Sequence, residues 1–421
     1  MNTLPSTIAP LRQQGRIHLW LAASIPICAI LLVLYTRHLH NRVLRPFVEG
    51  ILHDDISSVR AGLDKGADVY AGTKYGCSAL VFAAEHDAVS AALSAVDTAK
   101  PIRLDIINLM LDHSGGKPAK SDEALTAWFL AAQYGRLDII KRLVGQGIDI
   151  NAHGKFTGFV NYQRDKGTAL TYAARHGHVE IVRYLLDHGA RVNEVGEFGR
   201  TALIEASLGG HADSIRTLAE HGANANFRDM RGRTALIGAF ATKKKECVQM
   251  LVDQKPDLNS EDEERDTALM LAVLLGCPDL EKVLLDAGAD VDHQNRIGQT
   301  ALIRAILATG LGEVNPVQNQ CVQLLLARKA NVNLHTRQGD TALMTAADRL
   351  QPEMVQMLLA NGANVTAKNV DGLTALGWAE GQLTHSQGKD DNLSRTGVAL
   401  APMQVKRHHE TVFRLKAAGA T

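Results

Sequence analysis

The sequence predicts an all-α solenoid, in which helix–turn–helix units with projecting β-hairpins stack on one another. A Thr-Ala-Leu triplet recurs along most of the chain, with five consecutive copies spaced 33 residues apart, followed by steps of 41 and 33. The triplets begin at Thr168, Thr201, Thr234, Thr267, Thr300, Thr341 and Thr374. A Gly-Ala pair keeps the same register at Gly189, Gly222, Gly288 and Gly362. A fixed period of this kind is typical of repeat proteins, in which each unit buries its apolar faces against its neighbours.

The unit from Lys166 to Val195 illustrates what each residue type contributes. Thr168 is expected to cap the first helix, because its hydroxyl can accept a hydrogen bond from a free helical N–H group. Alanines keep that helix thin, so that a second helix can pack closely behind it. The apolar residues of the two helices are Ala169, Leu170, Ala173, Ala174, Ile181, Val182, Leu185 and Leu186. Gly189 is expected to end the second helix in the left-handed conformation, and residues 190–199 then turn outward as a hairpin.

These residues and their spacing resemble the ankyrin repeat over about 375 of the 421 residues. The resemblance implies about eight good units with degenerate caps between residues 43 and 421. It also implies a non-catalytic protein that recognises another protein through its concave face and hairpin tips. The chain departs from the family where His normally follows the Leu, at Thr171, Ile204, Ile237, Met270, Ile303 and Met344. Lys255 and Lys329 replace the glycine after the second helix, at a cost on the order of 1 kcal/mol each, so we expect these repeats to be softer.

Charge and motifs exclude several classes of function. The chain has 45 Lys and Arg residues and 45 Asp and Glu residues, so no overall field attracts nucleic acid. It contains no G-x-S-x-G motif, phosphate-binding loop or H-E-x-x-H motif, and its 17 histidines lack metal-ligand spacing. His178 and His211, each after a glycine, are expected to be structural residues of inter-helix turns. We therefore predict no enzyme activity, metal, cofactor or small-molecule substrate.

A single membrane anchor is predicted near the N-terminus. After a short polar segment, residues 1–16, an apolar run of 19 residues extends from Ile17 to Tyr35, about 28 Å as a helix, which matches a bilayer core. We expect a single-pass transmembrane helix over residues 17–36. The alternative is a cleaved signal peptide, but the run is long for one and residues 36–40 offer no small-residue cleavage site.

Two weak observations bear on the orientation of this anchor. Two arginines precede it, and three follow it: Arg37, Arg42 and Arg45. Cys247 and Cys321 occupy the same slot of second helices two repeats apart, which is too far for a disulfide, and free thiols favour a reducing compartment. We therefore expect the array on the cytosolic side, with an extracytosolic array as the open alternative.

The regular array is expected to be bordered by degenerate units and interrupted by insertions. The first unit comprises short helices at residues 47–52 and 56–63, and insertions are predicted near residues 86–101, 153–166, 309–320 and 381–404. The insertion at 309–320 is expected to lengthen an inter-helix turn. The last helix, residues 405–418, is expected to close the stack with a polar, basic surface. The alternative for that surface is a site for acidic or lipid head groups.

Two groups of residues are candidates for partner binding. The long hairpin at 153–166 carries three aromatic residues, and rings on projecting loops are common binding elements. These are Phe156, Phe159 and Tyr162, next to the first-helix positions Tyr134, Tyr172, Arg175 and His176. The alternative is that the rings cover the adjacent repeat.

The second group is an apolar patch of leucines at positions that ankyrin repeats normally expose: Leu271, Leu274, Leu275 and Leu307, with Arg304 beside them. The hairpin at 260–266 adds five acidic residues, so the pair would suit a basic amphipathic segment. The alternative is that the leucines pack on each other across repeats. The sequence thus predicts a membrane-anchored adaptor or scaffold for another protein. The alternative function is a self-associating membrane sensor or channel accessory subunit.

Overall fold

The computed structural model describes residues 55–67, 109, 122–155, 166–311, 315–381 and 402–420. The chain forms two compact units, residues 1–202 with 220–223, and residues 203–219 with 224–421. The predicted N-terminal segment and transmembrane helix, residues 1–36, lie outside the described ranges, as do helix 47–52 and the insertion at 86–101. Within the described ranges, no helix combines the length and the apolar character that crossing a membrane requires.

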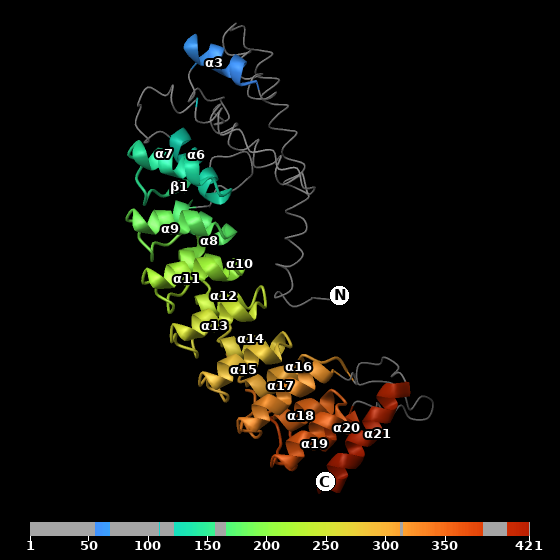
Figure 1. Ribbon diagram of the computed structural model, residues 1–421. Helices are drawn as coiled ribbons and strands as arrows, with labels where there is room; N and C mark the ends of the chain where they lie inside the picture. Colours follow the sequence, from blue (N-terminus) through green and yellow to red (C-terminus); the bar gives the residue numbers. More distant parts are fainter. Residues whose placement is uncertain are drawn as a thin grey trace. The chain divides into compact units, whose positions relative to one another are not determined.

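Helices arranged in pairs make up each unit (Figure 1). The first unit contains α3 (Ile56–Asp64), α6 (Asp122–Gln133), α7 (Leu137–Gly145), β1 (Gly154–Lys155), β2 (Lys166–Gly167), α8 (Ala169–His176), α9 (Val179–Asp187) and η1 (Glu197–Gly199). The second contains most of α10 (Ala202–Gly209) and α11 (Ala212–Glu220), then α12 (Ala235–Ala239), α13 (Lys245–Asp253), α14 (Ala268–Leu274), α15 (Pro278–Asp286), α16 (Ala301–Leu307), α17 (Pro316–Ala327), α18 (Ala342–Asp348), α19 (Pro352–Ala360), α20 (Ala375–Gly381) and α21 (Pro402–Ala417). The all-α solenoid predicted from the sequence is confirmed.

Threonine caps start the first helices, as predicted. Oγ1 of Thr168 accepts a hydrogen bond from the amide of Thr171 at 3.3 Å, and the threonines before α12, α14, α16 and α18 make the same bond. At α8 the cap is reciprocal, because the amide of Thr168 donates to Oγ1 of Thr171 at 2.9 Å. A threonine in the slot of the missing family histidine therefore completes a capping box.

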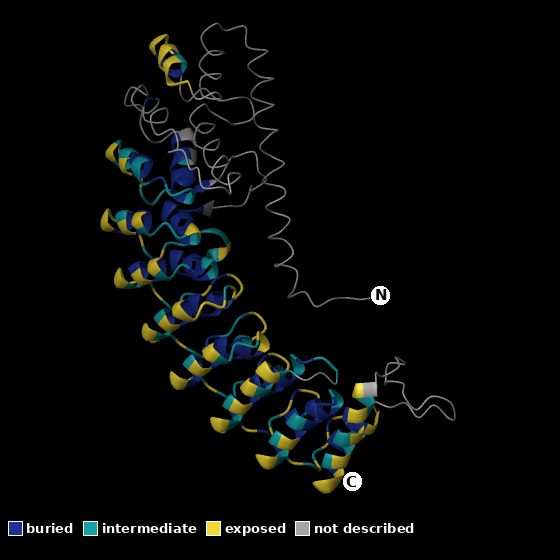
Figure 2. Ribbon diagram, turned by 45° about the vertical axis from the view of Figure 1, so that its right-hand side comes forward, coloured by how far each residue is buried: buried dark blue, intermediate teal, exposed yellow. Residues whose placement is uncertain are grey.

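The core lies between the paired helices. In α8, the residues from Ala169 to Ala174 are buried, and Ile181, Val182 and Leu185 of α9 are at most 1% exposed. The second helices expose residues on their outer sides, whereas the first helices are mostly buried (Figure 2). The first helices are thus largely buried, because they pack both on their own partner helices and on the first helices of neighbouring repeats.

The second helices end in left-handed residues. Gly189, Gly288 and Gly362 have φ angles of 95°, 93° and 83°. Lys255 and Lys329 take the same position with φ of 53° and 60°, as the repeat register predicts. A side chain in this conformation is strained, so these two junctions carry a cost that the glycine junctions avoid.

Two sets of hydrogen bonds join successive repeats in the second unit. On the hairpin side, Oδ1 of Asn226 accepts from the amide of Asp257 at 2.7 Å, and Oδ1 of Asn259 accepts from the amide of Asp290 at 2.9 Å. On the inter-helix-turn side, a donor reaches back to a carbonyl oxygen of the preceding repeat. These pairs are Lys244 with Gly210 at 2.8 Å, Gln318 with Val273 at 3.1 Å, and Gln351 with Ile306 at 3.4 Å. In the first unit His178 does the same with Gln133 at 2.8 Å, which confirms its structural role.

The last two insertions differ from expectation in one respect. Residues 316–320 do not extend a turn, because they belong to α17, which has 12 residues and is capped by the side chain of Asn315. The prediction of a simple turn insertion was therefore wrong for this part. Of the insertion at 381–404, residues 382–401 lie outside the described ranges, and α21 begins at Pro402. Helix α21 packs on α19 and α20 and closes the second unit, as predicted.

Candidate partner-binding surfaces

In the first unit, the long hairpin starts from a two-stranded base. Strands β1 and β2 pair antiparallel, with Gly154 opposite Gly167. A Cβ added to Gly154 would lie 1.7 Å from Cε2 of Phe129, and one added to Gly167 would lie 2.8 Å from Cε2 of Tyr172. Both glycines are required because two rings press against the strands. The predicted binding residues Phe156, Phe159 and Tyr162 lie between the strands and outside the described ranges.

Tyr172 lies beneath this hairpin base. Its side chain is 6% exposed, and its ring centroid is 5.6 Å from that of Phe129 on the neighbouring first helix, α6. The structure thus places this predicted binding residue in the core, where it supports the hairpin instead of facing a partner. Periodicity could not reveal this, because the ring of Tyr172 lies against Gly167 of a two-stranded base that has no second copy among the described residues.

The other predicted residues of this unit are more accessible. Tyr134, just after α6, is half-buried, and His176 at the end of α8 is exposed with its ring 6.3 Å from that of His178. Arg175 is half-buried, and Nη2 lies 4.0 Å from Oε2 of Glu197. Because α6 and α8 are neighbours, these side chains share one edge of the unit.

The predicted leucines of the second unit lie on two neighbouring first helices, α14 and α16. Leu274 and Leu275 are each 37% exposed, whereas Leu271 and Leu307 are half-buried. The rest of α14, from Ala268 to Met270 and at Ala272 and Val273, is buried. Leucines at i, i+3 and i+4 therefore form the outward side of α14. We call Leu271, Leu274, Leu275 and Leu307 the leucine patch.

A basic turn borders the leucine patch. Lys243, Lys244 and Lys245 connect α12 to α13 and are all exposed. Nζ of Lys243 donates to the carbonyl oxygen of Leu275 at 3.3 Å, which places this turn next to the end of α14. A cation near the C-terminus of a helix also stabilises the helix dipole. Sequence reasoning missed this turn, although the run of three lysines was visible.

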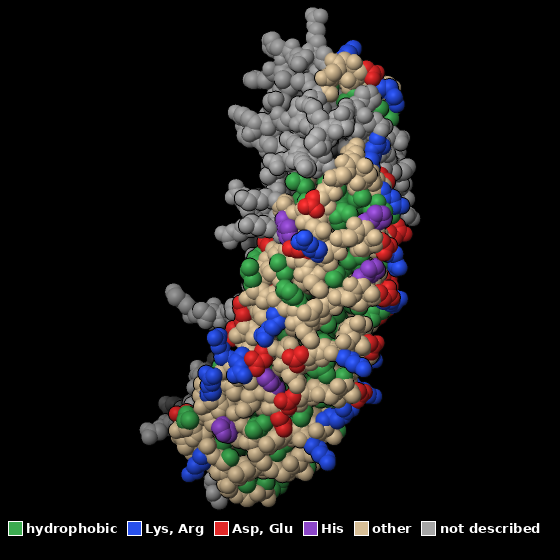
Figure 3. Space-filling model, turned by 90° about the vertical axis from the view of Figure 1, so that its left-hand side faces the viewer, with side chains coloured by type: hydrophobic (Ala, Val, Ile, Leu, Met, Phe, Trp, Pro, Cys, Tyr) green, Lys and Arg blue, Asp and Glu red, His purple; other side chains and the backbone are tan. Residues whose placement is uncertain are grey.

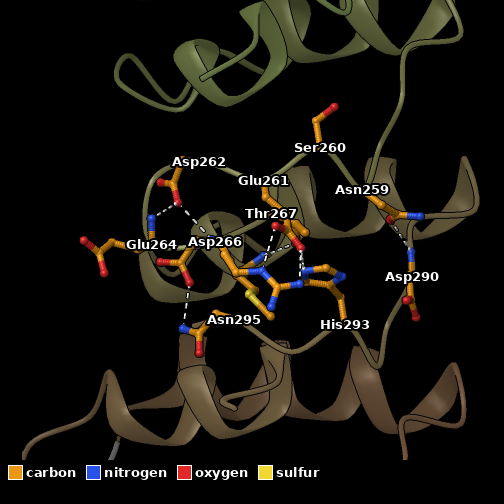
Figure 4. Close-up of polar contacts among 12 residues, drawn as sticks. Asn259, Ser260, Glu261, Asp262, Glu264, Asp266, Thr267, Asp290, His293 and Asn295 are labelled. Atoms are coloured by element: carbon orange, nitrogen blue, oxygen red, sulfur yellow. Dashed lines mark hydrogen bonds and ion pairs between the residues drawn. The ribbon is translucent and has the colours of Figure 1, made fainter. Parts of the chain in front are cut away.

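The carboxylates of the acidic hairpin, residues 260–266 just before α14, are mostly engaged in hydrogen bonds and ion pairs within the protein (Figure 4). Glu261 accepts two hydrogen bonds from the guanidinium of Arg265, at 2.8 and 2.9 Å, and lies 3.0 Å from Nε2 of His293. The hydrogen bonds from Arg265 lower the pKa of Glu261. Asp266 is buried and accepts hydrogen bonds from Asn295, at 2.8 Å, and from Nη2 of Arg304.

Asp262 is likewise engaged, since its Oδ1 accepts from the amides of Glu264 and Asp266 at 3.0 and 2.9 Å. Burial raises the pKa of Asp262. Of the acidic residues of this hairpin, only Glu263 and Glu264 are exposed, next to the exposed Arg265. The hairpin therefore offers a partner much less negative charge than its sequence suggests, and Arg304 is held by Asp266 instead of facing outward.

A groove of about 590 Å³ lies beside the hairpins of residues 290–298 and 334–337. Its charged and histidine side chains are Arg265, Asp290, Asp292, His293, His335 and Arg337. Nε2 of Gln294 donates to the carbonyl oxygen of His335 at 2.9 Å and ties the two hairpins together. The mixture of signs fits a polar segment better than a single anion or cation. The sequence did not indicate this groove, because its residues come from hairpins one repeat apart.

Positive and negative side chains are also mixed on the face of the molecule shown in Figure 3. Figure 3 shows Lys and Arg, Asp and Glu, and His side chains interspersed, with hydrophobic side chains in small separate groups. Among the described residues, no three His, Cys, Asp or Glu side chains are grouped so that they could hold a metal ion. Cys247, Cys277 and Cys321 are free thiols.

The comparison with protein-family models agrees with this architecture. A family model described as "Ankyrin repeats (3 copies)" matches residues 129–229, 221–295, 288–369 and 314–385. The crystal structure of the human ASB11 ankyrin repeat domain is 25% identical, with a TM-score of 0.46, over 59% of this chain and 98% of that chain. The ankyrin repeat domain of Bcl-3, described as a unique member of the IkappaB protein family, is 29% identical, with a TM-score of 0.46, over 51% and 94%. No curated protein matches this sequence.

Proposed function

Because this chain belongs to the ankyrin-repeat family, we propose that it is a non-catalytic adaptor that binds another protein through the leucine patch. The observation that carries the proposal is the outward side of α14, where Leu274 and the capping Leu275 are each 37% exposed, Leu271 is half-buried and the other residues are buried. Exposed apolar groups beside charged ones are typical of protein interaction sites.

The partner is best described as an amphipathic segment with an apolar stripe and charges of both signs. Its apolar residues would cover the leucine patch. Acidic residues would meet Lys243, Lys244 and Lys245, and basic residues would meet Glu263 and Glu264 at the hairpin tip. A purely basic segment is less suited, because Arg265, Arg304 and neighbouring amides already satisfy the other acidic side chains of this hairpin.

A second contact is proposed in the first unit. Tyr134, Arg175 and His176 lie at the C-terminal ends of the neighbouring helices α6 and α8, and the hairpin with Phe156, Phe159 and Tyr162 starts from strands that contact both helices. Tyr172 is assigned a supporting role under β2, because its ring is buried. Rings on a hairpin with a rigid base would serve as anchors for a partner.

The leucine patch is tested by changing Leu271, Leu274 and Leu275 together to alanine. A partner that the wild-type chain retains in a pull-down is expected to be lost. Val370→Ala is the matched control, since Val370 is 71% exposed at a hairpin tip of the same unit and is not in the patch. Circular dichroism of each variant checks that the fold is kept. Equal retention by the triple variant would remove the leucine patch as the site.

We also propose that residues 17–36 anchor the chain in a membrane, which is supported by the predominantly apolar run from Ile17 to Tyr35 that contains no Asp, Glu, Lys or Arg. The full chain is expected to stay with membranes during alkaline carbonate extraction, and a variant lacking residues 1–36 is expected to be released. Extraction of the full chain would disprove the anchor.

The orientation is proposed to be cytosolic, in line with the free thiols of Cys247, Cys277 and Cys321. A Ser386→Cys variant is expected to react with a membrane-impermeant thiol reagent only after cell lysis. Labelling of intact cells would place the array on the opposite side. The wild-type chain, treated in the same way, serves as the background control.

A further inference from the structure

One second helix carries a charged residue type in a slot that is otherwise aliphatic. In α15 the position concerned lies three residues before the buried Leu284. The equivalent position of six other described second helices holds a buried branched aliphatic residue: Ile140, Val182, Ile215, Val248, Val322 and Val355. In α15 this residue is Glu281, which is 0% exposed. A carboxyl group therefore stands where the repeat architecture places a branched aliphatic side chain.

The carboxyl group of Glu281 has little to compensate for its burial. Within the described residues, no N–H or O–H group donates to either oxygen, and the side chain that interacts with the carboxyl is the weakly donating thiol of Cys321 on α17. Such a group is costly to bury in its charged form. Burial accordingly raises the pKa of Glu281 to about 8, and burial together with this carboxyl raises the pKa of Cys321.

Among the described residues, the elements packed on α15 supply no cation to Glu281. Helix α14 has no titratable side chain. On α13 and its cap, the charges of Lys244 and Glu246 influence the pKa of Cys247. Near the start of α15, the charges of Lys243 and Asp279 influence the pKa of Cys277. From α17 only Cys321 faces the carboxyl. The neutral acid is therefore the form that the closed stack accommodates.

The same repeat also lacks a bond that its neighbours have. Cys277 occupies the slot in which Lys244, Gln318 and Gln351 donate to the preceding repeat, but its thiol points to the carbonyl oxygen of Leu275 in its own repeat, at 3.6 Å. The junction before it keeps a bond from Nζ of Lys243 to the carbonyl oxygen of Leu275 at 3.3 Å, but it lacks the bond from the second-helix position and contains the strained Lys255.

We propose that the α14–α15 repeat is a proton-controlled weak point of the second unit, which is closed when Glu281 is neutral and opens locally when Glu281 ionises. Opening separates α15 from α17 and hydrates the carboxylate. This inference does not depend on the proposed function. If α14 also carries the partner site, the site and the weak point coincide, and acidification strengthens binding.

The direction follows from proton linkage. The closed repeat keeps a proton that the open repeat releases at an ordinary pKa near 4.5, so the full stabilisation is present below pH 4.5. It is lost progressively as pH rises toward 8, with one proton released per opening event. The opening equilibrium should therefore increase up to about tenfold per pH unit in this window.

Hydrogen exchange of the full chain, followed by mass spectrometry, tests this at pH 5.5 and 7.5. Rates are divided by the intrinsic rate at each pH, so that only the opening equilibrium remains. Peptides from α14, α15 and α17 are expected to open up to about a hundredfold more at pH 7.5. Peptides from α18 and α19 provide the internal control and should change little.

Two variants distinguish opening caused by ionisation of Glu281 from a low stability of this repeat at every pH. Glu281→Val restores the residue type of the other repeats, and Glu281→Gln keeps the shape without the charge. Both are expected to abolish the pH dependence, and Glu281→Val should also raise protection at pH 7.5. A wild-type chain without the pH dependence, or either variant with it, would overturn the proposal. The glutamine variant keeps the test valid if the valine variant folds poorly.

Discussion

Nε of Arg407 on the last helix, α21, donates a hydrogen bond to the carbonyl oxygen of Leu350, which lies in the turn between α18 and α19, at 3.2 Å. The same guanidinium forms an ion pair with Glu353 at the start of α19, and its side chain is only 7% exposed. One arginine therefore fastens the closing helix to the turn and to the second helix of the preceding repeat.

Replacing Arg407 with alanine is expected to loosen α21 and to lower the free energy of unfolding by about 2 kcal/mol. Losing one member of a buried pair is costly, but Glu353 is 43% exposed and can be rehydrated in part. Urea denaturation measures the change, and a Glu353→Gln, Arg407→Met double variant should recover part of it. No change in stability would mean that apolar contacts alone hold α21.

The same pair predicts a pH dependence. Burial alone would raise the pKa of Glu353, but the hydrogen bonds and charge of Arg407 outweigh it and hold that pKa below its usual range. The pair therefore stabilises fully above the unfolded pKa and is lost as pH falls through the folded value. Denaturation between pH 6 and 3 should show a smaller loss in Arg407→Ala than in the wild-type chain.

Glycine at position 255 or 329 is expected to stabilise the protein by roughly 0.5–1 kcal/mol. The lysines are left-handed there, and relief of that strain is partly offset by the greater freedom of glycine in the unfolded chain. Urea denaturation measures the gain. Gly362→Ala, at an equivalent junction with φ of 83° and no atom within 4 Å of the added Cβ, is the opposite control and should destabilise.

Alanine at Gly154 is expected to destabilise the base of the long hairpin by about 2 kcal/mol. Its Cβ would overlap the ring of Phe129, which is almost completely buried and cannot move freely. Gly145→Ala in α7 is the control, because no atom lies within 4 Å of its added Cβ and alanine favours helix. Thermal unfolding of both variants should therefore shift in opposite directions.

Alanine at Thr267 is expected to cost about 1 kcal/mol by removing the cap of α14, whereas Thr267→Ser should keep most of it. Urea denaturation gives the cost, and exchange of the α14 amides shows whether the loss is local. Equal stability of the alanine and serine variants would show that the hydroxyl is not the stabilising group.

Features that repeat along the chain could be predicted from it. The threonine caps, the left-handed lysines at 255 and 329, and the closing helix follow from register, because one unit explains the others. The start of α17 is also encoded locally, since Asn315 before Pro316 is a strong helix-start signal, whereas the 41-residue step of the repeat predicts a longer turn.

Features that depend on contacts between different repeats could not be predicted. Arg304 neutralises Asp266 from 38 residues away, and the ring of Tyr172 lies against Gly167 of β2 and the ring of Phe129 on α6. Periodicity assigns both to the surface because it describes an average repeat. Glu281 is the intermediate case. Aligning the sequences of the second helices reveals its unusual residue type, whereas its burial and its lack of an N–H or O–H donor can be seen only in the structure.

The amides of Asp257 and Asp290 donate to the side chains of Asn226 and Asn259, so that each hairpin is joined to the next one in series. Tension applied along the stack of the second unit would pass through each junction in turn, so every junction bears the whole load. The force at which the unit begins to extend is then set by its feeblest junction and not by its total stability. Because Cys277 makes no bond to the repeat before it, the hairpin bond and the bond from Lys243 to Leu275 carry the load at that junction, which should yield first in an optical trap. A Cys277→Gln variant should raise the first rupture force.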